Sequence, residues 1–139
     1  MALTAADHWD AAAIRSGAMV ALVFAVPFSL AARWAIDSRD DGALAVWFNV
    51  GAVAGFVLGA GCAAWVQRTG TPLSHGIVTA VGTYIAAQAV FIVVRLIRDS
   101  DVSWAALVFN LSITTGAGLL GGLLGQRLRS RGVFPSDHS

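Results

Sequence analysis

Residues 43–67 read ALAVWFNVGAVAGFVLGAGCAAWVQ, a run that contains no charged side chain. A helix rises about 1.5 Å per residue, so a run of this length can cross a hydrocarbon core about 30 Å thick. No water is available in that core to bond the backbone, and a lone apolar run must therefore satisfy its amides and carbonyls within itself, as a helix does. The stretch predicts a membrane-spanning helix.

Three further charge-free runs occupy residues 16–32, 76–94 and 102–126. With 57% hydrophobic and 12% charged residues, the chain is too apolar for a soluble domain of 139 residues. We therefore predict an all-α polytopic membrane protein, a single domain over residues 1–139 with a short cytoplasmic tail at 128–139. The four predicted transmembrane helices cover approximately residues 14–36, 43–67, 73–95 and 102–127.

Residues with capping chemistry stand before three of the spans. Asp41 precedes the second span, and Thr71 with Pro72 opens the third. Ser100 or Asp101 is expected to cap the fourth span.

The arginine distribution predicts the orientation. With four spans both termini share a side, and that side holds five arginines whereas the opposite side holds four. The positive-inside rule then places both termini in the cytoplasm. Because the two counts are nearly balanced, insertion in both orientations stays open.

Corresponding residues recur in the two halves of the chain. Arg33 with Asp37 and Arg95 with Asp99 end the first and third spans at an offset of 62. The second and fourth spans match at an offset of 61, pairing Phe48-Asn49 with Phe109-Asn110, Gly55 with Gly116, Leu58 with Leu119 and Gly61 with Gly122. The pattern is that of two parallel-repeat helical hairpins, inserted the same way up. Chance similarity between two glycine-rich helices is the alternative.

Small residues recur every fourth position in three spans. In lipid, helices associate closely where small side chains let their backbones approach. We expect these glycine-zipper faces to be helix-packing surfaces, inside the protomer or between protomers. They comprise Gly17, Ala21 and Ala25 in the first span, Gly51, Gly55 and Gly59 in the second, and the pairs Gly118/Gly122 and Gly121/Gly125 in the fourth.

Polar side chains form the other candidate surfaces. They are Asn110 and Thr114 in the fourth span, His75, Thr79 and Thr83 on one face of the third, Tyr84 and Gln88 on another, and Asn49 in the second. The Asn110/Thr114 and His75/Thr79 faces could line a polar path, or these groups could hydrogen-bond helices. His75 is expected to be a wetted residue near a cap rather than a metal ligand or proton relay.

Several classes of function are disfavoured. The spans contain no acidic residue, and they contain no nucleophile paired with a base and no metal-ligand cluster, so we expect no enzyme and no cofactor. The single cysteine excludes an internal disulfide, and a net charge of +1 gives no field for nucleic acid. The expected partners are the lipid bilayer and either further copies of this chain or another membrane protein.

The motifs carry one resemblance to a family. Arg68-Thr69-Gly70 and His75-Gly76 precede or open the third span, and the fourth ends in the run GGLLGQR from Gly121 to Arg127. With four short-looped spans, this pattern resembles the small uncharacterised four-span membrane proteins of Gram-positive, high-GC actinobacterial bacteria. The resemblance implies a bacterial plasma-membrane protein and no activity.

Two better-known four-span families fit poorly. Small multidrug-resistance transporters are expected to carry a glutamate in the first span, and none is present. Small fluoride channels carry a Thr-Thr-Phe-Ser-Thr-like run, where this chain has Thr114-Thr115-Gly116. Two functions stay open: a structural or assembly protein, which we favour, or a small oligomeric channel or carrier.

Overall fold

The computed structural model describes residues 8–135, and this part of the chain contains four α-helices and no strand. They are α1 (Ala11–Arg39), α2 (Gly42–Val66), α3 (Pro72–Ile97) and α4 (Trp104–Ser130). Each is long and apolar enough to cross a membrane. The predicted all-α, four-span architecture is confirmed.

The helix ends differ from the predicted spans mainly in α1 and α4. Helix α1 begins at Ala11 rather than at residue 14, because Asp10 caps it by accepting a hydrogen bond from the amide of Ala13 at 3.0 Å. Asp41 caps α2 in the same way, through Leu44 at 2.9 Å, as its position predicts. Helix α4 runs to Ser130, so the predicted tail at 128–139 begins inside the helix and its last four residues lie outside the described residues.

The predicted cap of α4 is wrong. Ser103, not Ser100 or Asp101, accepts the hydrogen bond from the amide of Ala106. The chain leaves α3 through Asp99 in a left-handed conformation, φ 50°, and the amide of Ser100 still bonds the carbonyl of Arg95. Ser100, one of the two predicted caps of α4, is therefore bonded to the end of α3 instead.

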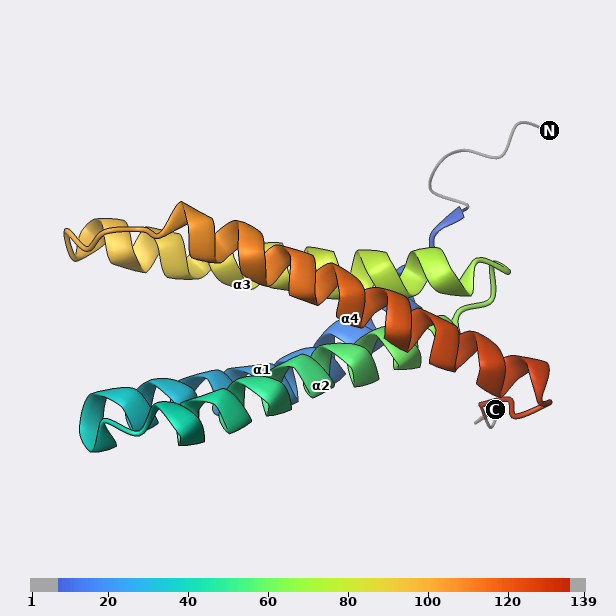
Figure 1. Cartoon of the computed structure of the whole chain (residues 1–139). Helices are drawn as coiled ribbons and strands as arrows, with labels where there is room; N and C mark the ends of the chain where they lie inside the picture. Colours follow the sequence, from blue (N-terminus) through green and yellow to red (C-terminus); the bar gives the residue numbers. More distant parts are fainter. Residues whose placement is uncertain (1–7, 136–139) are drawn as a thin grey trace.

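The four helices form two antiparallel hairpins, α1–α2 and α3–α4, which are arranged as a V (Figure 1). The hairpins cross near the end of the molecule that carries the start of α1, the end of α4 and the α2–α3 loop (Figure 1). Toward the other end, which carries the α1–α2 and α3–α4 turns, they diverge.

Small residues fill the core, and large apolar residues cover the outside. Six alanines and two aromatic residues form the central buried cluster: Ala21, Ala25, Ala52, Phe56, Ala60, Ala80, Tyr84 and Ala117. In contrast, the side chains of Leu58, Leu120 and Leu124 are each more than half exposed. This is the distribution expected of helices that contact each other through small residues and present leucines to lipid.

Candidate functional site

The two hairpins join where α2 crosses α4 at glycines. A Cβ added at Gly125 would lie 2.6 Å from the carbonyl oxygen of Gly61 and 2.7 Å from the Cβ of Ala64. One added at Gly121 would press against the carbonyl oxygen of Val57. Only glycine allows the two backbones to approach this closely, so the crossing depends on these positions.

The helices within each hairpin also touch through small residues. A Cβ at Gly59 of α2 would lie 2.5 Å from the carbonyl oxygen of Gly17 in α1. Similarly, a Cβ at Gly76 of α3 would lie 2.7 Å from the Cα of Gly122 in α4, and Gly118 lies against Ala80. The remaining members of the α1–α2 face lie in the same seam: Ala21 and Ala25 are buried, Gly55 lies against Phe24, and Gly51 lies under the ring of Phe28.

Helix α4 thus uses its two overlapping Gly-x-x-x-Gly pairs for different neighbours. Gly118 and Gly122 face α3, whereas Gly121 and Gly125 face α2. Residues four apart lie on one face of a helix. The second pair begins three residues after the first, which turns its face around the helix axis, so the two pairs can contact different helices. Gly116, the expected counterpart of Gly55 in the repeat, has no atom within 4 Å of an added Cβ, so these two positions are not equivalent in packing.

At the crossing end, His75 is fully buried, not wetted as predicted. Its Nε2 accepts a hydrogen bond from the backbone amide of Asp10 at 2.9 Å, and its Nδ1 lies 2.8 Å from the carbonyl oxygen of Thr71. Since an amide can only donate and a carbonyl can only accept, the ring is neutral and carries its proton on Nδ1. The Trp9 ring lies beside it, with centroids 5.4 Å apart. Asp10 is 65 residues from His75 in sequence, so no local pattern indicates the contact.

The charged side chains of Asp10 and Arg129 connect further elements at the crossing end. The second carboxylate oxygen of Asp10 accepts a hydrogen bond from the amide of Arg68 at 3.2 Å, which ties the start of α1 to the α2–α3 loop. Arg129 of α4 donates to the carbonyl oxygens of Trp65 and Gln67 at the end of α2. A helix end leaves such carbonyls without intrahelical partners, so Arg129 acts as a C-terminal cap supplied by another helix.

Some polar groups in this region have no partner. The side-chain oxygen of Gln67 accepts from the amide of Thr69 at 2.8 Å, but its side-chain nitrogen is buried without a hydrogen bond. The hydroxyl of Thr79 is likewise buried and unpartnered, while its methyl carbon lies against Gly17. Thr79 is therefore held by packing rather than by its hydroxyl.

A cleft of about 610 Å³ lies between the two hairpins, in the opening of the V. Its polar lining consists of Ser29, Asn49, Tyr84, Gln88, Asn110 and Thr114, and its apolar lining includes Val46, Val50, Phe56, Phe109 and Ile113. Both asparagines of the repeated Phe-Asn pairs are exposed, Asn49 on α2 and Asn110 on α4. The cleft therefore collects most of the polar side chains predicted to matter within the spans.

The hydrogen bonds in the cleft are mostly local. Asn49 donates to the carbonyl of Ala45 in its own helix at 2.9 Å, and Thr114 donates to the carbonyl of Asn110 at 2.8 Å. Tyr84 reaches from α3 to α4, where its hydroxyl donates to the carbonyl oxygen of Leu107 at 3.2 Å. The side-chain amides of Asn49 and Asn110 thus keep unused hydrogen-bonding capacity.

The two polar faces predicted to line one path surround different spaces. Asn110 and Thr114 line the cleft, whereas His75 and Thr79 are buried at the crossing end. Thr83, also on the His75 face, is buried as well. Tyr84, Gln88 and Asn110 also border a smaller cavity of about 120 Å³ together with Arg95.

The chemistry available in these sites is hydrogen bonding. Residues 8–135 contain no group of three histidine, cysteine or carboxylate side chains placed to hold a metal ion. No protein family, curated protein or solved structure matches this chain.

The helix contacts predict different effects of two glycine-to-alanine changes on the stability of the fold. Gly59→Ala places a Cβ 2.5 Å from a backbone oxygen of α1 and should lower the free energy of unfolding by about 1–3 kcal/mol, the usual cost of overpacking. Gly116→Ala meets nothing within 4 Å and should be neutral. Unfolding in mixed micelles measures both. Equal stability of the two variants would contradict the packing described for Gly59.

Two buried residues four positions apart on α3 should respond differently to loss of their polar atoms. His75→Leu leaves the amide of Asp10 unpaired and should cost about 1–3 kcal/mol. Thr79→Val keeps the methyl against Gly17 and removes an unpartnered hydroxyl, so it should be neutral or stabilising. The same unfolding assay compares them, and a clear loss of stability in Thr79→Val would show that its hydroxyl has a partner.

Proposed function

We propose that this protein is a structural or assembly protein of the bacterial plasma membrane, not an enzyme, with its cleft as the surface that binds a partner. The support is the pair of exposed amides, Asn49 and Asn110, on the walls of a cleft inside the apolar part of the helices. Amides in that position favour a hydrogen-bonding partner over lipid chains.

The packing glycines also support the cleft as the surface that binds a partner, because their own contacts lie within the protomer. Gly17, Gly59, Gly118 and Gly122 lie inside a hairpin, and Gly121 and Gly125 lie at the crossing. Helix contacts within the protomer therefore occupy the faces that the sequence offers for close association. The cleft is the polar surface left for contact with another helix.

The simplest occupant of the cleft is a helix from a second copy of the chain. Each copy carries an exposed asparagine on each hairpin, and an amide both donates and accepts. In a two-fold dimer the same patch meets itself, so asparagines of one copy can pair with those of the other.

The dimer predicts a specific effect of removing the amides. Asn49→Leu with Asn110→Leu removes two interhelical hydrogen bonds worth about 0.6 kcal/mol each, which should weaken dimerisation roughly sevenfold. Single-molecule photobleaching in liposomes across a range of protein densities measures the equilibrium. Ser112→Leu is the control, because Ser112 is exposed on α4 but does not line the cleft. A parent protein that stays monomeric at every density would rule out the second copy as occupant.

A carrier of a small solute is the second candidate, favoured by the volume of the cleft. About 610 Å³ lies within the range of ligand sites, and the site lies between two hairpins, as in transporters built from repeats. On this alternative, Asn110→Leu abolishes solute flux into liposomes while dimerisation and stability persist. The assembly proposal expects no flux from the parent protein.

The proposed orientation has both termini in the cytoplasm. Reporter fusions after Arg39, Gly70, Ser100 and Ser139 should then report outside, inside, outside and inside. A consistently inverted pattern would reverse the orientation. A mixed pattern would mean that the chain inserts both ways.

A further inference from the structure

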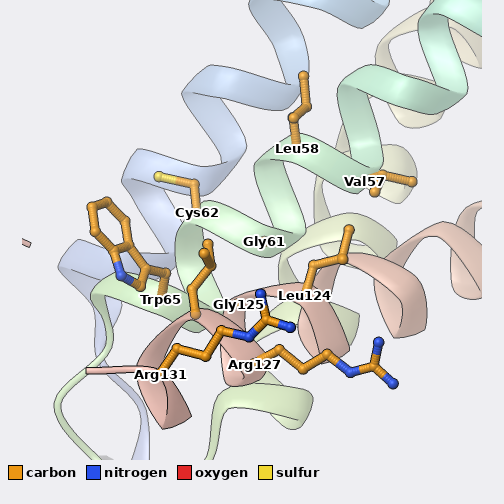
Figure 2. A pocket seen from close by; sticks show the side chains of 10 residues that line it. Val57, Leu58, Gly61, Cys62, Trp65, Leu124, Gly125, Arg127 and Arg131 are labelled. Carbon is orange, nitrogen blue, oxygen red and sulfur yellow. The ribbon is translucent and has the colours of Figure 1, made fainter. Parts of the chain in front are cut away.

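A second hollow, separate from the cleft, lies along the crossing of α2 and α4 (Figure 2). Its volume is about 440 Å³, and Gly61 and Gly125 contribute no side chains to fill it. The remaining lining residues are Val57, Leu58, Cys62 and Trp65 from α2, and Leu124, Arg127 and Leu128 from α4 with Arg131 just beyond its end. We call this hollow the α2–α4 groove.

The groove is apolar along its length and basic at one end. Arg127 lies in the last turn of α4 and Arg131 directly follows the helix, four residues on, so both can lie on one side of it. No carboxylate among residues 8–135 pairs with either guanidinium. Arg129, between them, instead binds the carbonyls of Trp65 and Gln67, so the alternate arginines have different roles.

The position of this charge matches a membrane interface. Helices α2 and α4 both end near the basic end of the groove, at Val66 and Ser130. The Trp65 indole nitrogen there donates to the carbonyl of Val133 at 2.7 Å, which holds the ring at the groove wall. Tryptophan and arginine near helix ends are typical of the headgroup region, and the leucines extend from it into the hydrocarbon.

We propose that the α2–α4 groove binds an anionic phospholipid, with the phosphate at Arg127 and Arg131 and an acyl chain against Leu58 and Leu124. The C-terminal ends of α2 and α4 carry partial negative charge, which disfavours a small free anion at this position. An acyl chain in the groove supplies the additional attraction by occupying its apolar surface. The two arginines select the headgroup charge. A lipid bound here contacts both hairpins and stabilises their crossing.

Native mass spectrometry of the purified protein, with lipids of identical acyl chains, tests the proposal. Phosphatidylglycerol should be retained at least about fivefold more than phosphatidylcholine. Arg127→Gln with Arg131→Gln should abolish this preference. The control is Arg33→Gln with Arg98→Gln, which removes the same charge from the opposite end of the helices and should leave the preference intact. Binding to purified protein is independent of how the variants insert into cells.

Two further arms test the location and the source of the phosphate. Cys62→Trp fills the groove without removing an arginine and should reduce retention of phosphatidylglycerol, while monodispersity and thermal unfolding verify its fold. Glycerol phosphate, which lacks acyl chains, should not displace the lipid. The proposal is overturned by equal retention of the two lipids, by an undiminished preference in the double arginine variant, by full binding to a folded Cys62→Trp protein, or by displacement with glycerol phosphate.

Discussion

The close approach of the α2 and α4 backbones at Gly121 and Gly125 is the contact on which the rest of the structure depends. It lies near one end of the helices, so the two hairpins meet there and diverge elsewhere (Figure 1). The cleft occupies the opening of the V, and the α2–α4 groove lies along the crossing, with Gly61 and Gly125 among its lining residues. One set of glycine contacts thus places both candidate binding surfaces, because it sets where the two hairpins meet and where they separate.

Hydrogen bonds at the same end fix the helices relative to each other. His75 connects α3 to the residue that caps α1, and Arg129 connects α4 to the end of α2. Each bond pairs a side chain with a backbone group that its own helix leaves unsatisfied, which is favourable where water is scarce. The diverging end has a different character: there Asn49 and Asn110 are exposed, and the Asn49 side chain bonds a carbonyl of its own helix. Hydrogen bonds between helices thus hold the crossing end, whereas the diverging end keeps side-chain amides with unused hydrogen-bonding capacity.

The sequence predicts the four helices well because charge-free runs of this length have one structural solution in lipid. It also indicates that Gly121 and Gly125 pack, but not that they face α2 while Gly118 and Gly122 face α3, since spacing alone does not name the neighbour. The burial of His75 could not be predicted, because its partner Asp10 lies 65 residues away. Likewise, both asparagines stand out in the sequence, whereas the cleft that they share arises from the angle between hairpins.

Cysteine cross-linking tests most directly whether the hairpins cross at one end and diverge at the other. Cys62 of α2 and Leu124 of α4 both line the groove at the crossing, and Leu124→Cys places no side chain at a glycine contact. A protease site after Gly70 reports whether a link joins the two hairpins. The crossing predicts that a short bifunctional thiol reagent joins Cys62 to Leu124→Cys in membranes, whereas Asp41→Cys with Asp101→Cys, in the two diverging turns and in a Cys62→Ser background, is not joined. A cross-link in the second pair and none in the first would contradict it.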